Sequence, residues 1–97
     1  MVNLSQIQGF DWDDGNAEKN WAKHKVTPEE CEKIFKNKPL NIFYDQQHSQ
    51  KENRFVAFGT INNKKLLTVA FIIRNNKIRI ISARNQSRKE RKIYAKN

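Results

Sequence analysis

The chain has 97 residues, 37% of them hydrophobic, which predicts one domain with a modest core. The longest uncharged apolar stretch, residues 66–73, is too short to span a membrane, and the first residues lack the basic start and apolar segment of a signal peptide. Because Cys31 is the only cysteine, an internal disulfide is excluded, and no histidine lies at the spacing from it that a zinc site needs. We therefore expect a cytoplasmic protein without metal or cofactor.

Positive charge is concentrated in the second half of the chain. Residues 1–50 contain 6 Lys/Arg and 8 Asp/Glu, whereas residues 51–97 contain 13 Lys/Arg and 2 Asp/Glu. Such an asymmetry favours a polyanionic partner, above all a nucleic acid. An acidic protein partner, or a domain that is merely basic and soluble, is the alternative interpretation of the charge count.

The N-terminal part predicts a first helix after an irregular start. Residues 1–9 are interpreted as a loose leader, and residues 10–97 as a single domain. Residues 10–12 form a short extended segment. Asp13 or Asp14 can then cap a helix over about residues 16–24.

A second helix follows directly. Thr27 is the predicted N-cap, Pro28 occupies the first helical position, and Glu30 completes a capping box. This helix is expected to end near residues 37–38, before Pro39.

The remainder of the chain predicts a sheet and a short last helix. The four expected strands cover residues 40–44, 54–61, 66–73 and 78–84. Asn pairs at residues 62–63 and 75–76 indicate tight turns between the later strands. Ser87 and Glu90 form a second capping box, which opens a helix to about Ala95. Helices followed by strands are typical of an α+β fold with helices on one face of an antiparallel sheet.

Arginines are concentrated on the predicted strands. Strict alternation of side chains predicts that Arg79 and Arg84 lie on opposite faces of the last strand, but not which one lies beside the core. Arg54 and Arg74, on neighbouring strands, come within reach of them. Converging guanidinium groups can bind a phosphate bidentately, although each arginine can equally be a solvated strand end.

Candidates for proton transfer are few. His24 ends the first helix, where a histidine acts as an acid or base or, more often, contacts helix carbonyls. Glu52 either pairs with an arginine or serves as a base, and His48 is interpreted as a turn residue in a polar loop. Tyr94 either stacks on a base or packs the last helix against the sheet.

This inventory favours metal-free RNA cleavage if the protein is an enzyme. The sequence shows no nucleophile triad and no paired carboxylates. With only three glycines, a glycine-rich nucleotide-binding loop is also excluded. In RNA the 2′-hydroxyl can attack its own phosphate, so the protein needs only a base, an acid and charge stabilisation. The alternatives are a non-catalytic module that binds nucleic acid through the same basic face, and a protein that binds only an acidic protein.

Several stretches of the chain resemble the BrnT toxin family. They are Phe-Asp-Trp-Asp at residues 10–13, residues 19–24, Val-Thr-Pro-Glu-Glu at 26–30, residues 48–49, Glu-Asn-Arg-Phe at 52–55, Gly59, residues 79–84, Glu90, Arg91 and Tyr94. The run Ile-Arg-Ile-Ile-Ser-Ala-Arg at residues 78–84 is the most specific of them. The chain departs from the family pattern in two places. Lys25 stands where the family usually has glycine, and Asn-Gln-Ser at residues 85–87 stands where a small residue often follows the Ser-Ala-Arg run.

The resemblance implies a RelE-like fold with two N-terminal helices, a four-stranded antiparallel sheet and a short C-terminal helix. It implies an endoribonuclease toxin of a type II toxin–antitoxin system that inhibits translation in the cytoplasm. It also implies neutralisation by a BrnA-type ribbon-helix-helix antitoxin, in a complex expected to be heterotetrameric and bound to operator DNA.

On this resemblance the candidate site has two parts. The expected catalytic residues are Arg54, Arg84, His24 and Glu52. The expected RNA- and phosphate-binding residues are Arg74, Arg79, Arg88, Lys89, Arg91 and Tyr94. Between the two arginines of the last strand, Arg84 is favoured as the one that faces the phosphate.

Overall fold

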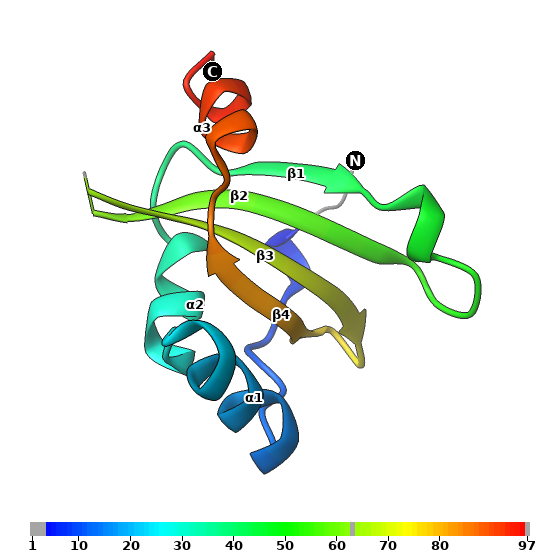
Figure 1. Ribbon diagram of the computed structural model, residues 1–97. Helices are drawn as coiled ribbons and strands as arrows, with labels where there is room; N and C mark the ends of the chain where they lie inside the picture. Colours follow the sequence, from blue (N-terminus) through cyan, green and yellow to red (C-terminus); the bar gives the residue numbers. More distant parts are fainter. Residues whose placement is uncertain (1–3, 63, 97) are drawn as a thin grey trace.

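The computed structural model describes residues 4–62 and 64–96, except the side chains of residues 20–22. Within these residues the chain forms three α-helices, two short 3-10 helices and one four-stranded antiparallel sheet with the order β1-β2-β3-β4 (Figure 1). The elements are η1 (Leu4–Gln6), α1 (Asp14–His24), α2 (Pro28–Ile34), β1 (Asn41–Tyr44), η2 (Gln46–His48), β2 (Arg54–Asn62), β3 (Lys65–Arg74), β4 (Lys77–Asn85) and α3 (Arg88–Tyr94). The predicted α+β fold class is confirmed, and each strand begins and ends within one residue of its predicted bounds.

The two faces of the sheet are covered unequally (Figure 1). Helices α1 and α2 lie against one face, which we call the core face, whereas α3 lies on the opposite side over one end of the sheet. We call this second side the open face. The expectation that all helices share one face is therefore wrong for α3. Among the described residues, no helix has both the length and the apolar character needed to cross a membrane.

The core forms between the core face and the first two helices. Its buried residues are Val26, Cys31, Ile34, Ala57, Leu67, Val69, Phe71, Ile78, Ile80 and Ala83. At Gly59 on β2 an added Cβ atom would lie 2.7 Å from Ile34 Cβ of α2. The helix therefore approaches the strand more closely than any other residue at this position would allow.

Helix α1 begins with a reciprocal pair of hydrogen bonds between Asp13 and Asn16. The Asn16 backbone N–H donates to Asp13 Oδ1 at 3.0 Å, and the Asp13 N–H donates to Asn16 Oδ1 at 2.7 Å. Asp13 is thus the cap, one of the two predicted candidates. Beyond the other end of the helix, Lys25 has a φ of 56°, in the left-handed region where glycine is favoured.

Helix α2 has the predicted capping box but ends earlier than expected. Glu30 N–H donates to Thr27 Oγ1 at 3.1 Å, and Thr27 N–H donates to Glu30 Oε1 at 3.0 Å. The helix ends at Ile34, three residues before the predicted end near residues 37–38. The side chain of Asn37 instead donates to the Thr60 and Ile61 carbonyls of β2, so this residue is tied to the sheet rather than to the helix.

The described part of the N-terminal segment is attached to the domain rather than loose. Leu4 and Ile7 pack against the core. Gln8 N–H donates to the Asn76 carbonyl at 2.7 Å, and Gly9 accepts from Ile78 N–H at 3.0 Å. Backbone hydrogen bonds to the β3–β4 turn and to β4 therefore hold this segment along the sheet edge. Residues 1–3 of the predicted leader lie outside the described residues, as does Asn63 of the predicted turn.

The face assignment of Arg79 and Arg84 from strict alternation is wrong because β4 contains a bulge. Phe71 of β3 pairs with Ile80, but the next residue, Ala70, pairs with Ser82, so Ile81 is an extra residue on β4. A bulge of one residue reverses the alternation beyond it. Arg79 and Arg84 consequently lie on the same side of the sheet, the open face.

Candidate functional site

Three arginines come together on the open face. Arg54 of β2 pairs with Ile72 of β3, and Ile72 pairs with Arg79 of β4, so the three residues form one row across the sheet. Arg74 lies two residues beyond Ile72 at the end of β3, on the same face. We call Arg54, Arg74 and Arg79 the arginine cluster.

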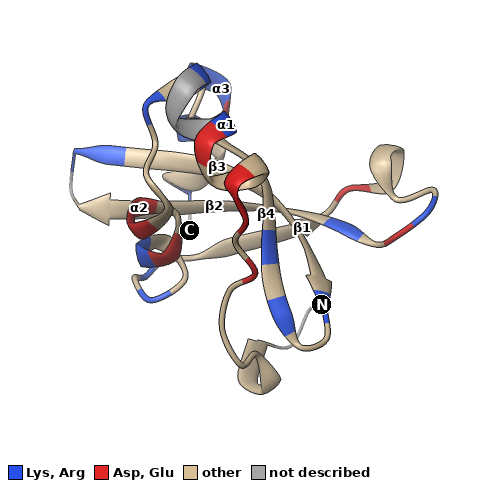
Figure 2. Ribbon diagram, turned by 90° about the horizontal axis from the view of Figure 1, so that it is seen from below, with Lys and Arg blue, Asp and Glu red and all other residues tan. Residues whose placement is uncertain are grey.

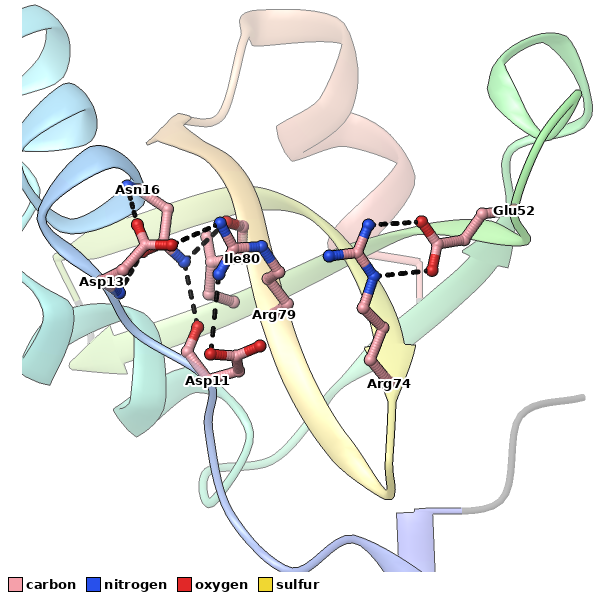
Figure 3. Close-up of polar contacts among 7 residues, drawn as sticks. All are labelled: Asp11, Asp13, Asn16, Glu52, Arg74, Arg79 and Ile80. Carbon is pink, nitrogen blue, oxygen red and sulfur yellow. Dashed lines mark hydrogen bonds and ion pairs between the residues drawn. The ribbon is translucent and has the colours of Figure 1, made fainter.

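Arg79 is held by the two aspartates that lead into α1 (Figure 3). Its Nη2 donates to Asp13 Oδ2 at 2.8 Å, and its Nη1 lies 3.6 Å from Asp11 Oδ1. The hydrogen bond from the Asn16 backbone, followed by that from Arg79, keeps the pKa of Asp13 below its usual value. Figure 2 shows this acidic stretch beside the basic residues of β4. The start of α1 and the orientation of Arg79 therefore depend on the same carboxylate.

Arg74 forms a two-pronged ion pair with Glu52 (Figure 3). Arg74 Nε donates to Glu52 Oε2 and Arg74 Nη2 donates to Glu52 Oε1, both at 2.9 Å. These bonds lower the pKa of Glu52 and raise that of Arg74, and the charge of Arg79 lowers the Glu52 pKa further. Glu52 thus pairs with an arginine, which is one of its two predicted roles. Arg74 and Arg79 both lower the pKa of its carboxyl group.

Two adjoining hollows border the cluster. The first, of about 440 Å³, is lined by residues that include His48, Lys51, Glu52, Arg54, Arg74 and Ile81. The second, of about 640 Å³, is lined by residues that include Asp13, Asn16, Lys19, Arg79 and Ile81. The bulge residue Ile81 lines both. The cluster therefore borders an open depression with charged walls, made up of these two hollows.

A histidine–aspartate pair lies beside the first hollow. His48 Nδ1 is 2.8 Å from Asp45 Oδ2, and Arg54 Nε is 3.7 Å from the same oxygen. The His48 side chain is 57% exposed. Arg54 Nε is buried without a hydrogen-bond partner among the described residues. The Asp45 carboxylate is thus shared by an accessible imidazole and a guanidinium.

Arg84 lies on the open face beside α3, where it pairs with Thr68, four residues along β3 from the Ile72 that pairs with Arg79. Its Nη1 and Nη2 donate to Glu90 Oε1 and Oε2 at 2.7 and 2.9 Å. Glu90 also accepts from Thr68 Oγ1 at 2.9 Å and from Ser87 N–H at 2.8 Å. These bonds lower the pKa of Glu90 to about 2, with the bond from Arg84 as the largest cause. Arg84 is therefore a connection between β4 and α3 and is still 43% exposed.

The other predicted binding residues lie on α3. Arg88 and Lys89 are exposed and form no ion pair within the described residues, and Arg91 donates from Nη1 to the Gln86 carbonyl at 2.9 Å. Tyr94 is only 7% exposed, and its hydroxyl donates to the Pro39 carbonyl at 2.6 Å. Its ring is therefore buried in the packing of α3, which is the second of the two predicted alternatives.

His24 lies apart from the cluster. It is exposed at the C-terminal end of α1 and borders neither hollow, and its side chain forms no hydrogen bond or ion pair with the described part of the chain. Of the predicted catalytic residues, the fold thus brings Arg54 and Glu52 together and leaves His24 and Arg84 elsewhere.

Four acidic and basic partners were not predicted as site residues: Asp11, Asp13, Asp45 and His48. The spacing of Asp45 and His48, three residues apart in one loop, was the available signal for the pair. The contacts of Asp11 and Asp13 with Arg79 span more than 60 positions of sequence and have no local signal.

The arrangement is suited to an oxyanion. A guanidinium has five N–H donors, so an arginine held by a carboxylate through one or two of them still has donors for a phosphate. Fixing the side chain beforehand reduces the entropy lost on binding. No group of three or more His, Cys, Asp and Glu side chains in the described residues is placed to hold a metal ion.

Fold and site together define a small α+β protein with preoriented arginines on an open sheet face. A family model described as "Ribonuclease toxin, BrnT, of type II toxin-antitoxin system" matches residues 12–90. The match covers most of the chain, and the chain therefore belongs to the BrnT family.

A solved structure supports the fold. The chain is similar to the Brucella abortus ribonuclease toxin BrnT, whose crystal structure it matches with a TM-score of 0.63 and 22% sequence identity. The match covers 82% of this chain and 97% of the Brucella chain. At this identity the likeness shows the fold alone. No curated protein matches the sequence significantly.

Proposed function

We propose that the protein is a metal-independent endoribonuclease that cleaves RNA by attack of the 2′-hydroxyl on the adjacent phosphate. The observation that carries this proposal is the arginine cluster, fixed by carboxylates at the border of an open depression. Membership of a family of ribonuclease toxins supports the same reaction.

In this proposal the cluster binds the scissile phosphate. As the 2′-oxygen attacks, negative charge grows on the non-bridging oxygens, and positioned guanidinium groups stabilise it. Arg54 and Arg79 occupy one row of the sheet on either side of Ile72, so a phosphate between them can contact both. Arg74 and Glu52 fix the border of the site. The exposed Arg84, Arg88, Lys89 and Arg91 extend the cationic surface toward the rest of the RNA.

The biological setting is part of the proposal. We infer that RNA cleavage inhibits translation in the cytoplasm and that a BrnA-type ribbon-helix-helix antitoxin neutralises the protein in a heterotetramer bound to operator DNA. The family description as a toxin of a type II system supports a protein antitoxin. An antitoxin that covers the open face would exclude RNA from the cluster.

Cleavage of bare RNA by the purified protein tests the reaction. We expect cleavage in the presence of EDTA, products that end in 2′,3′-cyclic phosphate and 5′-hydroxyl, and no cleavage at a site that carries 2′-deoxyribose. Abolition by EDTA, or cleavage of the deoxy site, would contradict the mechanism.

Variants of the cluster test the site. Arg79→Lys retains a charge but not the guanidinium fork, and we expect it to lose roughly 10²-fold or more in cleavage rate. Lys33→Ala removes an exposed cation of α2, on the other side of the sheet, and is the matched control. Equal activity of both variants would show that the cluster is not the site.

A non-catalytic nucleic-acid-binding module is the second candidate, because the exposed cations of α3 can bind RNA without any chemistry. Two results together would favour this module. The purified protein would bind RNA with a steep salt dependence but not cleave it, and its expression without antitoxin would not arrest cell growth.

A further inference from the structure

His48 and Asp45 have the geometry of an oriented base. A carboxylate can only accept hydrogen bonds, so the 2.8 Å contact with Asp45 Oδ2 requires that His48 Nδ1 carries the proton. In the neutral imidazole the other nitrogen, Nε2, is then an acceptor. In hydrolases that use a buried aspartate, the aspartate orients the imidazole in the same way.

The pair lies where RNA would be bound. His48 lines the first hollow together with Arg54 and Arg74 of the arginine cluster. Arg54 Nε lies 3.7 Å from the Asp45 oxygen that contacts His48, so one carboxylate positions both a proton acceptor and a phosphate ligand. With 57% of its side chain exposed, His48 is accessible to a substrate.

The two carboxylates that hold Arg74 and Arg79, Glu52 and Asp13, are less suitable as bases. Glu52 uses both oxygens in its ion pair with Arg74, which lowers its pKa and hence its strength as a base. Asp13 is engaged by the cap of α1 and by Arg79. The charged groups that line the hollow with His48 are Lys51, Glu52, Arg54 and Arg74, and Asp45 contacts its ring directly.

We propose that His48 is the general base of RNA cleavage and that Asp45 is its positioning residue; this inference rests on the proposed ribonuclease function. His48 Nε2 takes the proton of the 2′-hydroxyl while the O2′–P bond forms. The P–O5′ bond breaks, and the 5′-oxygen takes a proton from water. His48 then returns its proton to solvent, and the products are a 2′,3′-cyclic phosphate and a 5′-hydroxyl.

The first test compares His48→Ala with Gln46→Ala, an exposed residue of the same 3-10 helix. We expect His48→Ala to lower kcat by roughly 10²–10⁴-fold with little change in RNA affinity, and to abolish the rise of the rate with pH near neutrality. Asp45→Asn should lower kcat and shift this rise, whereas Gln46→Ala should behave as wild type. A His48→Ala rate within about threefold of wild type, or a loss confined to RNA affinity, would overturn the inference.

A chemically modified substrate separates a base from an acid. An RNA with sulfur in place of the bridging 5′-oxygen has a leaving group that needs no proton. A missing base still impairs its cleavage, so His48→Ala should remain slow on this substrate. Recovery to the wild-type rate would make His48 the acid and overturn its role as base. Failure of the wild type to cleave any RNA would overturn both proposals, whereas wild-type cleavage with an unimpaired His48→Ala would overturn this one alone.

Discussion

Arg84 and Glu90 form a two-pronged ion pair, with contacts of 2.7 and 2.9 Å, that joins the end of β4 to the first turn of α3. Glu90 is also the residue that completes the capping box of α3 and accepts from Thr68 of β3. One carboxylate therefore starts the helix and fixes it to two strands. This is the principal polar attachment of α3 to the open face.

The pair predicts an acid-sensitive contribution to stability. The pKa of Glu90 is lowered from 4.5 to about 2, so its stabilising effect is complete above the unfolded-state pKa and is lost as the pH falls from about 4.5 toward 2. Because Arg84 is 43% exposed, solvent screening reduces the contribution, and we expect about 1–2 kcal/mol. In urea denaturation the free-energy difference between Glu90→Gln and wild type should be largest at pH 7, smaller at pH 3, and should continue to shrink toward pH 2.

The same residues test the proposed phosphate role of Arg84. If Arg84 binds RNA, Arg84→Ala lowers RNA affinity, whereas Glu90→Gln retains or raises it because the guanidinium is released. If Arg84 is only structural, both variants lose stability and neither changes the affinity of the folded protein. Fluorescence anisotropy with a labelled RNA, below the unfolding transition of each variant, distinguishes these results.

A second prediction concerns the close approach of α2 to β2. In Gly59→Ala the new Cβ meets Ile34 Cβ at 2.7 Å, an atom fixed to the helix backbone that cannot rotate away. We expect a loss of about 1–3 kcal/mol in the free energy of unfolding. Gly15→Ala is the control, because only the carboxylate oxygen of Asp13 approaches its Cβ, at 3.2 Å. Equal stability of Gly59→Ala and wild type would mean that α2 can shift away from the sheet.

Local signals in the sequence were sufficient for much of this fold. The capping boxes at Thr27 and Ser87 each involve residues three apart, and both are present. The bulge at Ile81 has no such signal, because it depends on how β4 pairs with β3. Strict alternation therefore failed at the position that decides which arginines share a face.

The candidate site was predicted in part for the same reason. Residue type and strand position identified Arg54, Arg74 and Arg79. The carboxylates that hold them come from the segment before α1 and from the loop around η2, which alternation in strands does not describe. His48 was interpreted as a turn residue because it lies in a polar loop, and the sequence does not show that this loop places it and Asp45 beside Arg54.

Lys25 gives a third prediction. Its φ of 56° is costly for a residue with a Cβ atom, whereas glycine adopts this conformation readily. We expect Lys25→Gly to increase the free energy of unfolding by up to about 1 kcal/mol, since the greater entropy of glycine in the unfolded chain offsets part of the gain. Thermal unfolding at neutral pH measures it. Lys25→Ala controls for loss of the charge and should not be stabilising.

A fourth prediction concerns the buried thiol of Cys31. Cys31 is 0% exposed, and burial raises its pKa to about 12, so the native protein holds almost no thiolate at pH 8. We expect a disulfide reagent to label the native protein orders of magnitude more slowly than the urea-unfolded protein, which should react to one equivalent. Rapid labelling without denaturant would show that α2 opens frequently.

The last prediction concerns α3, whose exposed cations are not neutralised as the arginine cluster is. Four carboxylates, those of Asp11, Asp13, Asp45 and Glu52, contact the three arginines of the cluster, so long-range attraction of RNA must come from elsewhere. Arg88 and Lys89 are exposed and form no ion pair within the described residues.

We therefore expect Lys89→Ala to weaken RNA binding and to reduce the slope of log K against log salt concentration, by at most about 0.7 for each phosphate contact removed. The loss should fall on KM rather than on kcat, since α3 lies apart from the reacting groups. Binding titrations at several salt concentrations, with Lys33→Ala as the control of equal charge, measure the slope. A loss of kcat with an unchanged slope would instead place Lys89 among the reacting groups.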